Sequence, residues 1–171
     1  MDLLRGFYRR VEAAVLDHGG VLDKFLGDGA MAVFGITEPA PDDALNAILA
    51  SRQLANDMAG WSQELAAAGL PVLRVAMGLH AGPVLIGDTG GTRHFTFTVT
   101  GDPVNVASRL QAITRDLGIV IAASDAVIEA ARSSGGHAAV EGFVEFPPQQ
   151  LRGRERPVGV WGWPMPSPVG K

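Results

Sequence analysis

The sequence contains no cysteine, which excludes a disulfide framework, a thiolate metal site and a cysteine nucleophile. It has no excess of basic residues either, because 14 Lys and Arg stand against 18 Asp and Glu, a formal net charge of −4. A nucleic-acid-binding domain usually shows a basic excess or a basic stripe, so we expect no nucleic-acid partner.

Long apolar runs are also missing. No stretch approaches the roughly 20 apolar residues that span a bilayer, and the first residues lack the basic-then-apolar pattern of a secretory leader. We therefore expect a cytoplasmic chain with no membrane segment within it. Whether a sensor or regulatory domain lies outside this chain stays open.

The residues that are present suit one ordinary domain with a hydrophobic core. The 171 residues are 47% hydrophobic and 19% charged, which is a typical balance for a folded domain of this size. We assign residues 1–163 to this domain and the Pro-rich residues 164–171 to a loose C-terminal tail.

Hydrophobic periodicity and turn residues predict alternating helices and strands. Helices are expected at 2–18, 43–68, 102–117 and from 124. A hairpin is expected at 21–34, and further strands or extended segments at 72–79, 83–88, 92–100, 119–123, 138–146 and 157–163. This order predicts an α/β sandwich of the α+β kind with at least partly antiparallel pairing.

The tip of the predicted hairpin carries a carboxylate. Asp28 lies between two glycines, and magnesium takes one or two carboxylates before it completes its shell with phosphate oxygens and water. An Asp in a turn is also favoured for backbone reasons alone, so both interpretations stay open. Lys24, four residues earlier, could donate to a base ring or could simply present its ammonium at the surface.

Two further groups of polar residues could bind a nucleotide. Asn105 and Arg109 are four apart and share a face near the start of a predicted helix, where an amide and a guanidinium suit a ribose and a phosphate. The cations of Arg152 to Arg156 could hold terminal phosphates. Both groups could instead be solvated surface. His80 has no second ligand at metal-binding spacing, so we interpret it as a core or turn histidine.

Three runs, taken together, resemble the class III adenylyl and guanylyl cyclase catalytic domain closely. They are HGGVLDKFLGDGAMAVFG at 18–35, VAMGLHAGPVLIGDTG at 75–90 and FTFTVTGDPVNVASRL at 95–110. The resemblance covers nearly the whole chain, as far as LRGRERPVGVW at 151–161. It implies a ferredoxin-like sandwich, with helices on a mostly antiparallel sheet, that makes 3′,5′-cyclic AMP and pyrophosphate from ATP in intracellular signalling.

The resemblance also implies roles for residues at the family's motif positions. In this family two domains pair head to tail and form active sites at their interface, so a homodimer is expected. Asp28 would hold one of two Mg²⁺ or Mn²⁺ ions, and Lys24 of the partner subunit would read the adenine. Thr96 falls at the second base-reading position, as in the Thr-bearing subclass that includes bicarbonate-responsive enzymes.

The remaining implied roles concern the sugar and the phosphates. Asn105 would orient the ribose, and Arg109 would stabilise charge in the transition state. Arg152 would bind the terminal phosphates, where the family usually has Lys. Guanylyl cyclases usually carry Glu at the Lys24 position, because a carboxylate accepts hydrogen bonds from guanine. An ammonium only donates, which favours ATP over GTP.

The chain departs from the family pattern at its start. The family begins with a central strand that ends in a first metal Asp, whereas residue 1 here already stands at the first helix. Asp2 lies too close to Asp28 in sequence to be that residue. We therefore expect a missing central strand and weak or absent turnover for this chain alone. The alternative is a non-catalytic regulatory module that binds nucleotide and dimerises.

Overall fold

The structure is a computed structural model that describes residues 3–88 and 97–164. Five helices and eight strands are assigned within these ranges. In chain order they are α1 (Leu3–Asp17), β1 (Val21–Leu26), β2 (Gly29–Val33), α2 (Asp43–Ala67), β3 (Met77–Leu79), β4 (Leu85–Asp88), β5 (Phe97–Thr100), α3 (Asp102–Leu117), β6 (Ile119–Ser124), α4 (Asp125–Ser133), α5 (His137–Val140), β7 (Val144–Gln149) and β8 (Val158–Pro164).

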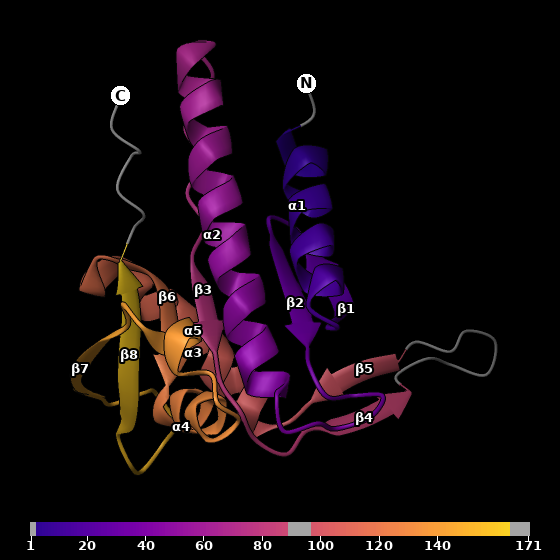
Figure 1. Cartoon of the computed structure of the whole chain (residues 1–171), viewed down its shortest axis with the longest axis vertical. Helices are drawn as coiled ribbons and strands as arrows, with labels where there is room; N and C mark the ends of the chain where they lie inside the picture. Colours follow the sequence, from indigo (N-terminus) through magenta and orange to yellow (C-terminus); the bar gives the residue numbers. More distant parts are fainter. Residues whose placement is uncertain (1–2, 89–96, 165–171) are drawn as a thin grey trace.

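The strands form three sheets, most of whose pairs are antiparallel. β1 pairs with β2, β4 pairs with β5, and the largest sheet has the order β3-β6-β8-β7. Only the β3–β6 pair of these is parallel. The prediction of an α+β sandwich with mostly antiparallel strands is therefore confirmed, and Figure 1 shows α1 and α2 running side by side over the hairpin and β3.

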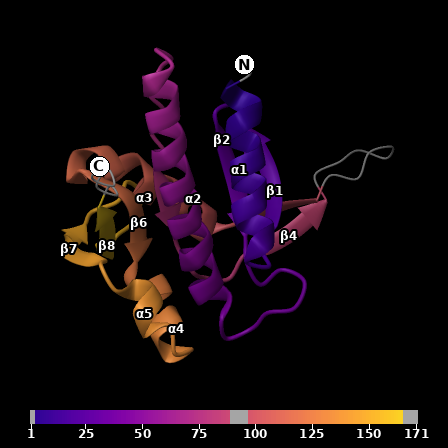
Figure 2. The same ribbon diagram turned by 45° about the horizontal axis from the view of Figure 1, so that its top comes forward.

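Three apolar clusters hold these elements together. Between α1, α2 and the β1–β2 hairpin, the buried side chains include Val11, Leu54 and Trp61. On the other side, β6 is buried along its entire length, because α2 and α4 cover one of its faces and α3 the other. Figure 2 shows α2 between the α1–hairpin unit and the unit formed by β6, β7 and β8. Burial of this apolar surface is the main force that fixes α3 and its polar face.

Within the described ranges, β2 pairs only with β1 and β3 pairs only with β6. One edge of each strand therefore lacks a ladder partner among the described residues. β7 is the outer strand of the largest sheet, and its two prolines, Pro147 and Pro148, remove backbone donors that another strand would need.

Three details of the prediction are wrong. Only the end of the segment predicted as a strand at 72–79 is paired, because β3 begins at Met77. Residues 137–140 form the helix α5 rather than a strand, in keeping with the helix propensity of two consecutive alanines. Pro164 belongs to β8 rather than to the predicted tail, and the rest of that tail lies outside the described residues.

In the part of the chain that the structure describes, no helix is both long and apolar enough to cross a membrane.

Candidate functional site

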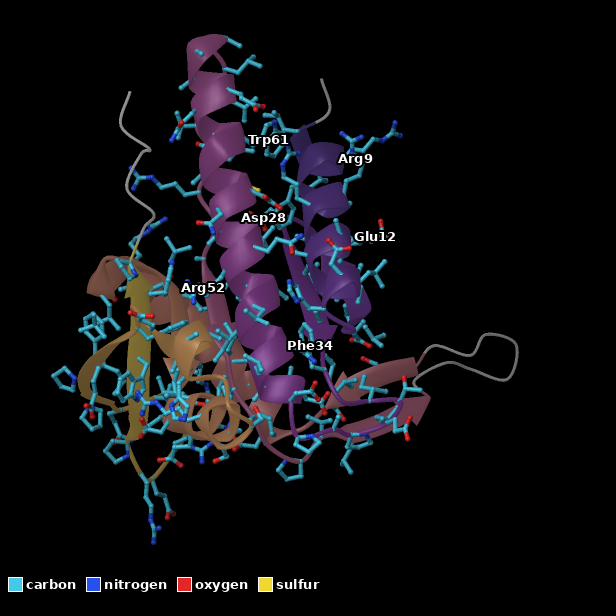
Figure 3. All side chains as sticks on the ribbon, in the orientation of Figure 1. Arg9, Glu12, Asp28, Phe34, Arg52 and Trp61 are labelled. Atoms are coloured by element: carbon cyan, nitrogen blue, oxygen red, sulfur yellow. The ribbon has the colours of Figure 1, made fainter. Side chains whose placement is uncertain are left out.

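The turn of the β1–β2 hairpin presents Asp28 to solvent. Gly27 takes a positive φ of 63°, which the turn requires and which a side chain would oppose. The hydroxyl of Tyr8 donates to the carbonyl of Gly27 at 2.5 Å, and its ring stacks on Phe25 with centroids 3.8 Å apart. The helix α1 therefore holds the turn from one side, and the exposed carboxylate stands at its tip, as Figure 3 shows.

The surroundings of Asp28 limit the kind of metal site that it can form. No group of three or more His, Cys, Asp or Glu side chains that could hold a metal ion gathers among the described residues. Asp28 therefore suits a divalent ion that is also bound by phosphate oxygens, since magnesium often takes only one or two protein carboxylates. The donor set fits that shared role and does not fit an all-protein cage.

Lys24 on β1 reaches across to β5. Its ammonium donates a hydrogen bond to the Thr98 hydroxyl, although the two residues are 74 positions apart. Thr98 is almost completely buried, whereas the side chain of Lys24 is 36% exposed. Sequence reasoning missed Thr98, and the predicted base-reading residue Thr96 lies outside the described residues. The alternation of residues along a strand, which predicted the hairpin arm around Lys24, does not indicate a contact with the distant Thr98.

Asn105 and Arg109 lie where the helical spacing predicted, on one side of α3. Asn105 is exposed and Arg109 is half-buried, while Val106 and Leu110 on the adjacent face are fully buried. The burial of these two apolar side chains sets the rotation of α3, so the amide and the guanidinium point away from the core.

The β7–β8 loop lies against this face of α3. Arg152 is exposed in the loop. A Cβ built on the neighbouring Gly153, whose φ is 75°, would lie 3.5 Å from Nη2 of Arg109. Arg154 donates to Asp102 in the first turn of α3 at 2.5 Å. The structure therefore brings Arg109 and the Arg152 loop together, and Arg154 is a tether rather than a free cation.

His80 lies at the end of β3 beside this loop. Its Nδ1 is 2.8 Å from the Ser124 hydroxyl. Burial lowers the pKa of His80 below its ordinary value, and the positive charge of Arg154 lowers it further, while Asp102 opposes both effects. A neutral imidazole hydrogen-bonded to a buried serine agrees with the prediction of a core or turn histidine.

Asp28, in the β1–β2 turn, and the β7–β8 loop that carries Arg152 lie far apart (Figure 1 and Figure 3). Figure 1 shows the β1–β2 turn at the upper end of the hairpin and the β7–β8 loop at the lower edge. Because Arg109 contacts that loop, one chain does not bring Asp28 to Arg109. A hollow of about 540 Å³ beside α4 and α5 is lined by none of the predicted site residues. The Asp28 turn and the face formed by Arg109 and the Arg152 loop are thus two separate polar regions of one chain.

Comparisons with a family model and with known proteins point to the same family. Residues 1–150 match the family model of the adenylate and guanylate cyclase catalytic domain. An adenylate cyclase of Anabaena cylindrica is 36% identical over 116 residues, which are 67% of this chain and 23% of that protein. The chain spans about a quarter of the length of the first curated relatives it matches.

Solved structures agree with this match. The adenylyl cyclase CyaB from P. aeruginosa superposes with a TM-score of 0.81 at 25% identity, over 94% of this chain and 80% of that chain. The guanylyl cyclase Cya2 superposes with a TM-score of 0.78 at 24% identity, over 97% of this chain and 81% of that chain. The second likeness shows the fold alone.

Proposed function

Because this chain belongs to the adenylate and guanylate cyclase catalytic domain family, we propose that it acts on ATP and forms 3′,5′-cyclic AMP and pyrophosphate. In this reaction the ribose 3′-oxygen loses its proton and forms a bond to the α-phosphorus, and the bond from that phosphorus to the pyrophosphate oxygen breaks. The protein contributes chiefly by positioning the nucleotide and by stabilising charge.

The observation that carries the choice of ATP is the contact between Lys24 and Thr98. An ammonium can only donate hydrogen bonds, and adenine N1 accepts one, whereas guanine N1 is itself a donor. The Thr98 hydroxyl next to the ammonium can accept from the adenine amino group. The pair thus offers a donor beside an acceptor, which matches the edge of adenine. We assign to Thr98 the second base-reading role that the sequence placed at Thr96.

The α3 face and the β7–β8 loop would hold the rest of the nucleotide. Asn105 is exposed in the first turns of α3, where its amide can orient the ribose. Arg109 contacts the loop at Gly153, so its guanidinium and that of Arg152 can approach the same phosphate chain. Arg109 would stabilise the charge that develops at the α-phosphate, and Arg152 would bind the terminal phosphates.

Asp28 is the residue that would hold divalent ions, Mg²⁺ or Mn²⁺, together with the phosphates. When bound, such ions neutralise phosphate charge and make the ribose hydroxyl easier to deprotonate. Because the β1–β2 turn that carries Asp28 lies far from the β7–β8 loop that carries Arg152 (Figure 1), the carboxylate that serves one nucleotide would come from a second copy of the chain.

A head-to-tail homodimer would bring Asp28 of one chain to the α3 face and the β7–β8 loop of the other at its interface. The β4–β5 arm, which Figure 1 shows projecting from the domain, supports this proposal. Leu85 is 72% exposed and Ile86 is 51% exposed on this arm, and consecutive residues of a strand face opposite sides. Apolar side chains on both faces of a projecting ribbon suit contact with a second copy.

A second candidate function is a regulatory module that binds nucleotide without turning it over. The observation that favours it is that no cluster of metal-binding side chains surrounds Asp28 among the described residues, whereas two-metal catalysis holds two ions close together. On this account the base-reading pair and the α3 face would still bind ATP, and the chain would signal through dimerisation.

Production of cyclic AMP from ATP with Mn²⁺ tests the proposal. We expect slow formation of cyclic AMP that Asp28→Asn and Arg109→Ala each abolish, with both variants folded by circular dichroism. Little or no cyclic GMP should form from GTP. Nucleotide binding without any product, in a sensitive assay, would favour the regulatory module instead.

A further inference from the structure

A nearly buried carboxylate stands beside the base-reading lysine. The side chain of Asp23 is only 6% exposed, and its Oδ2 lies 3.2 Å from the ammonium of Lys24. This oxygen is buried and accepts no hydrogen bond within the described residues. Burying a carboxylate that is incompletely hydrogen-bonded is unfavourable, so its position next to Lys24 calls for an explanation.

A β-bulge makes this arrangement possible. Consecutive side chains of a regular strand point to opposite faces, which would separate Asp23 from Lys24. The register against β2 shifts between Leu22, which pairs with Ala32, and Lys24, which pairs with Met31. Asp23 is the extra residue, and a bulge changes the direction of neighbouring side chains. The irregularity thus lets two adjacent residues form an ion pair.

The ion pair changes what the ammonium can recognise. One N–H of Lys24 donates to Thr98 and its charge is opposed by Asp23, which leaves the rest of a partly exposed ammonium for a ligand. A lone ammonium attracts any phosphate as a point charge. An ammonium that is neutralised by a neighbouring carboxylate gains much less from a phosphate, but it can still donate a hydrogen bond to an uncharged base.

The other cations of the site show the contrast. Neither Arg109 nor Arg152, which we assign to the phosphates, forms an ion pair with a carboxylate in the described part of the chain. Among the residues that the structure describes, the cation assigned to the base is thus paired with a carboxylate, and the cations assigned to the phosphates are not. This pattern would direct the triphosphate towards α3 and the base towards β1 and β5.

We propose that Asp23 is a specificity-determining positioning residue, which neutralises and orients Lys24 so that the ammonium reads the base and does not bind phosphate. This inference rests on the proposed function, because it assumes that Lys24 contacts the base. It does not require Asp23 to touch the nucleotide.

Binding measurements without turnover test the proposal. A fluorescent ATP analogue bound to the chain is displaced by 3′-deoxy-ATP, 3′-deoxy-GTP or tripolyphosphate in the presence of Mg²⁺; the two nucleotides lack the attacking hydroxyl. The variants are Asp23→Asn, Lys24→Met and the double variant. Asp17→Asn, which removes a charge from an exposed carboxylate at the end of α1, is the matched control.

We expect Asp23→Asn to lower the preference for 3′-deoxy-ATP over 3′-deoxy-GTP by about fivefold or more and to tighten tripolyphosphate binding. In the Lys24→Met background the same substitution should change neither quantity, because Asp23 acts through Lys24. Asp17→Asn should change neither. If thermal unfolding shows that Asp23→Asn is not folded, Asp23→Ser, which is smaller and also uncharged, provides the same readout.

The two possible failures differ. A wild-type chain with no preference between the nucleotides, or a preference that Lys24→Met leaves unchanged, overturns the proposed base-reading role and this inference with it. A preference that Lys24→Met removes but Asp23→Asn leaves intact overturns only the role of Asp23. An equal effect of Asp23→Asn with and without Lys24 shows a merely structural role and also contradicts the proposal.

Discussion

Arg154 donates a hydrogen bond to the carboxylate of Asp102 at 2.5 Å, although 52 residues separate the two along the chain. The pair joins the β7–β8 loop to the first turn of α3. The Asp102 side chain is 62% exposed and that of Arg154 is 31% exposed, so the pair contributes only about 0–1 kcal/mol to stability. Its main effect is to hold Gly153, and with it the loop that carries Arg152, beside Arg109.

Replacement of Arg154 with Met should therefore weaken the binding of ATP without lowering the stability of the fold. We expect a nearly unchanged thermal midpoint and roughly tenfold weaker binding of ATP, because the loop that carries Arg152 loses its tether. Arg156→Met removes the same charge from an exposed position in the same loop and should have a smaller effect. Equal losses of ATP affinity in the two variants would show that only overall charge matters.

Gly153 provides a test of the loop conformation. Its φ of 75° disfavours any side chain, although a Cβ would meet Arg109 only at an ordinary distance of 3.5 Å. Gly153→Ala should therefore lower the free energy of unfolding by about 1 kcal/mol through backbone strain. Gly60→Ala, in the middle of α2 with no atom within 4 Å, should instead stabilise the chain by about 0.4–1 kcal/mol. Urea unfolding of both variants checks the pair, and an unchanged or higher stability of Gly153→Ala would contradict the described loop.

His80 should make stability depend on pH. Its pKa is lowered in the folded chain, first by burial and then by Arg154, so between the two pKa values the unfolded chain binds more protons. The contribution of His80 to stability is therefore complete when the pH is above its ordinary pKa of 6.5. This contribution is lost as the pH falls below that value. Thermal midpoints from pH 8 to about 5, above the range where most carboxylates titrate, should decline in wild type and decline less in His80→Asn. Parallel curves for the two proteins would contradict this account.

Tyr8 should stabilise the hairpin turn in two separable ways. Tyr8→Phe removes the hydrogen bond to Gly27 but keeps the ring on Phe25, so we expect a loss of about 1 kcal/mol. Tyr8→Leu should lose about 0.5–1.5 kcal/mol more, because the aromatic stack is also removed. Denaturant unfolding of the three proteins measures both steps. If Tyr8→Phe and wild type are equally stable, the hydroxyl does not hold the turn.

Local patterns predicted much of the structure. The four-residue spacing placed Asn105 and Arg109 on one face of α3, and the glycines around Asp28 placed it in a hairpin turn; both elements are confirmed. These predictions succeed because helix and hairpin geometry depend mainly on neighbours in sequence.

Long-range contacts could not be predicted in the same way. The approach of Lys24 to Thr98 depends on how β5 packs beside β1, which no spacing within either strand specifies. The bulge at Asp23 interrupts the regular alternation of side chains along β1. The tether of Arg154 to Asp102 depends in turn on the placement of the β7–β8 loop against α3.

Activity from a mixture of two inactive variants tests the central claim most directly. Asp28→Asn and Arg109→Ala are assayed separately and together for cyclic AMP formation from ATP with Mn²⁺. If each site combines Asp28 of one subunit with Arg109 of the other, the equimolar mixture should regain about a quarter of the wild-type rate, since half of the dimers are mixed and each has one intact site. If the mixture forms no more cyclic AMP than either variant alone, while the wild type is active, the result would contradict a site shared between two chains.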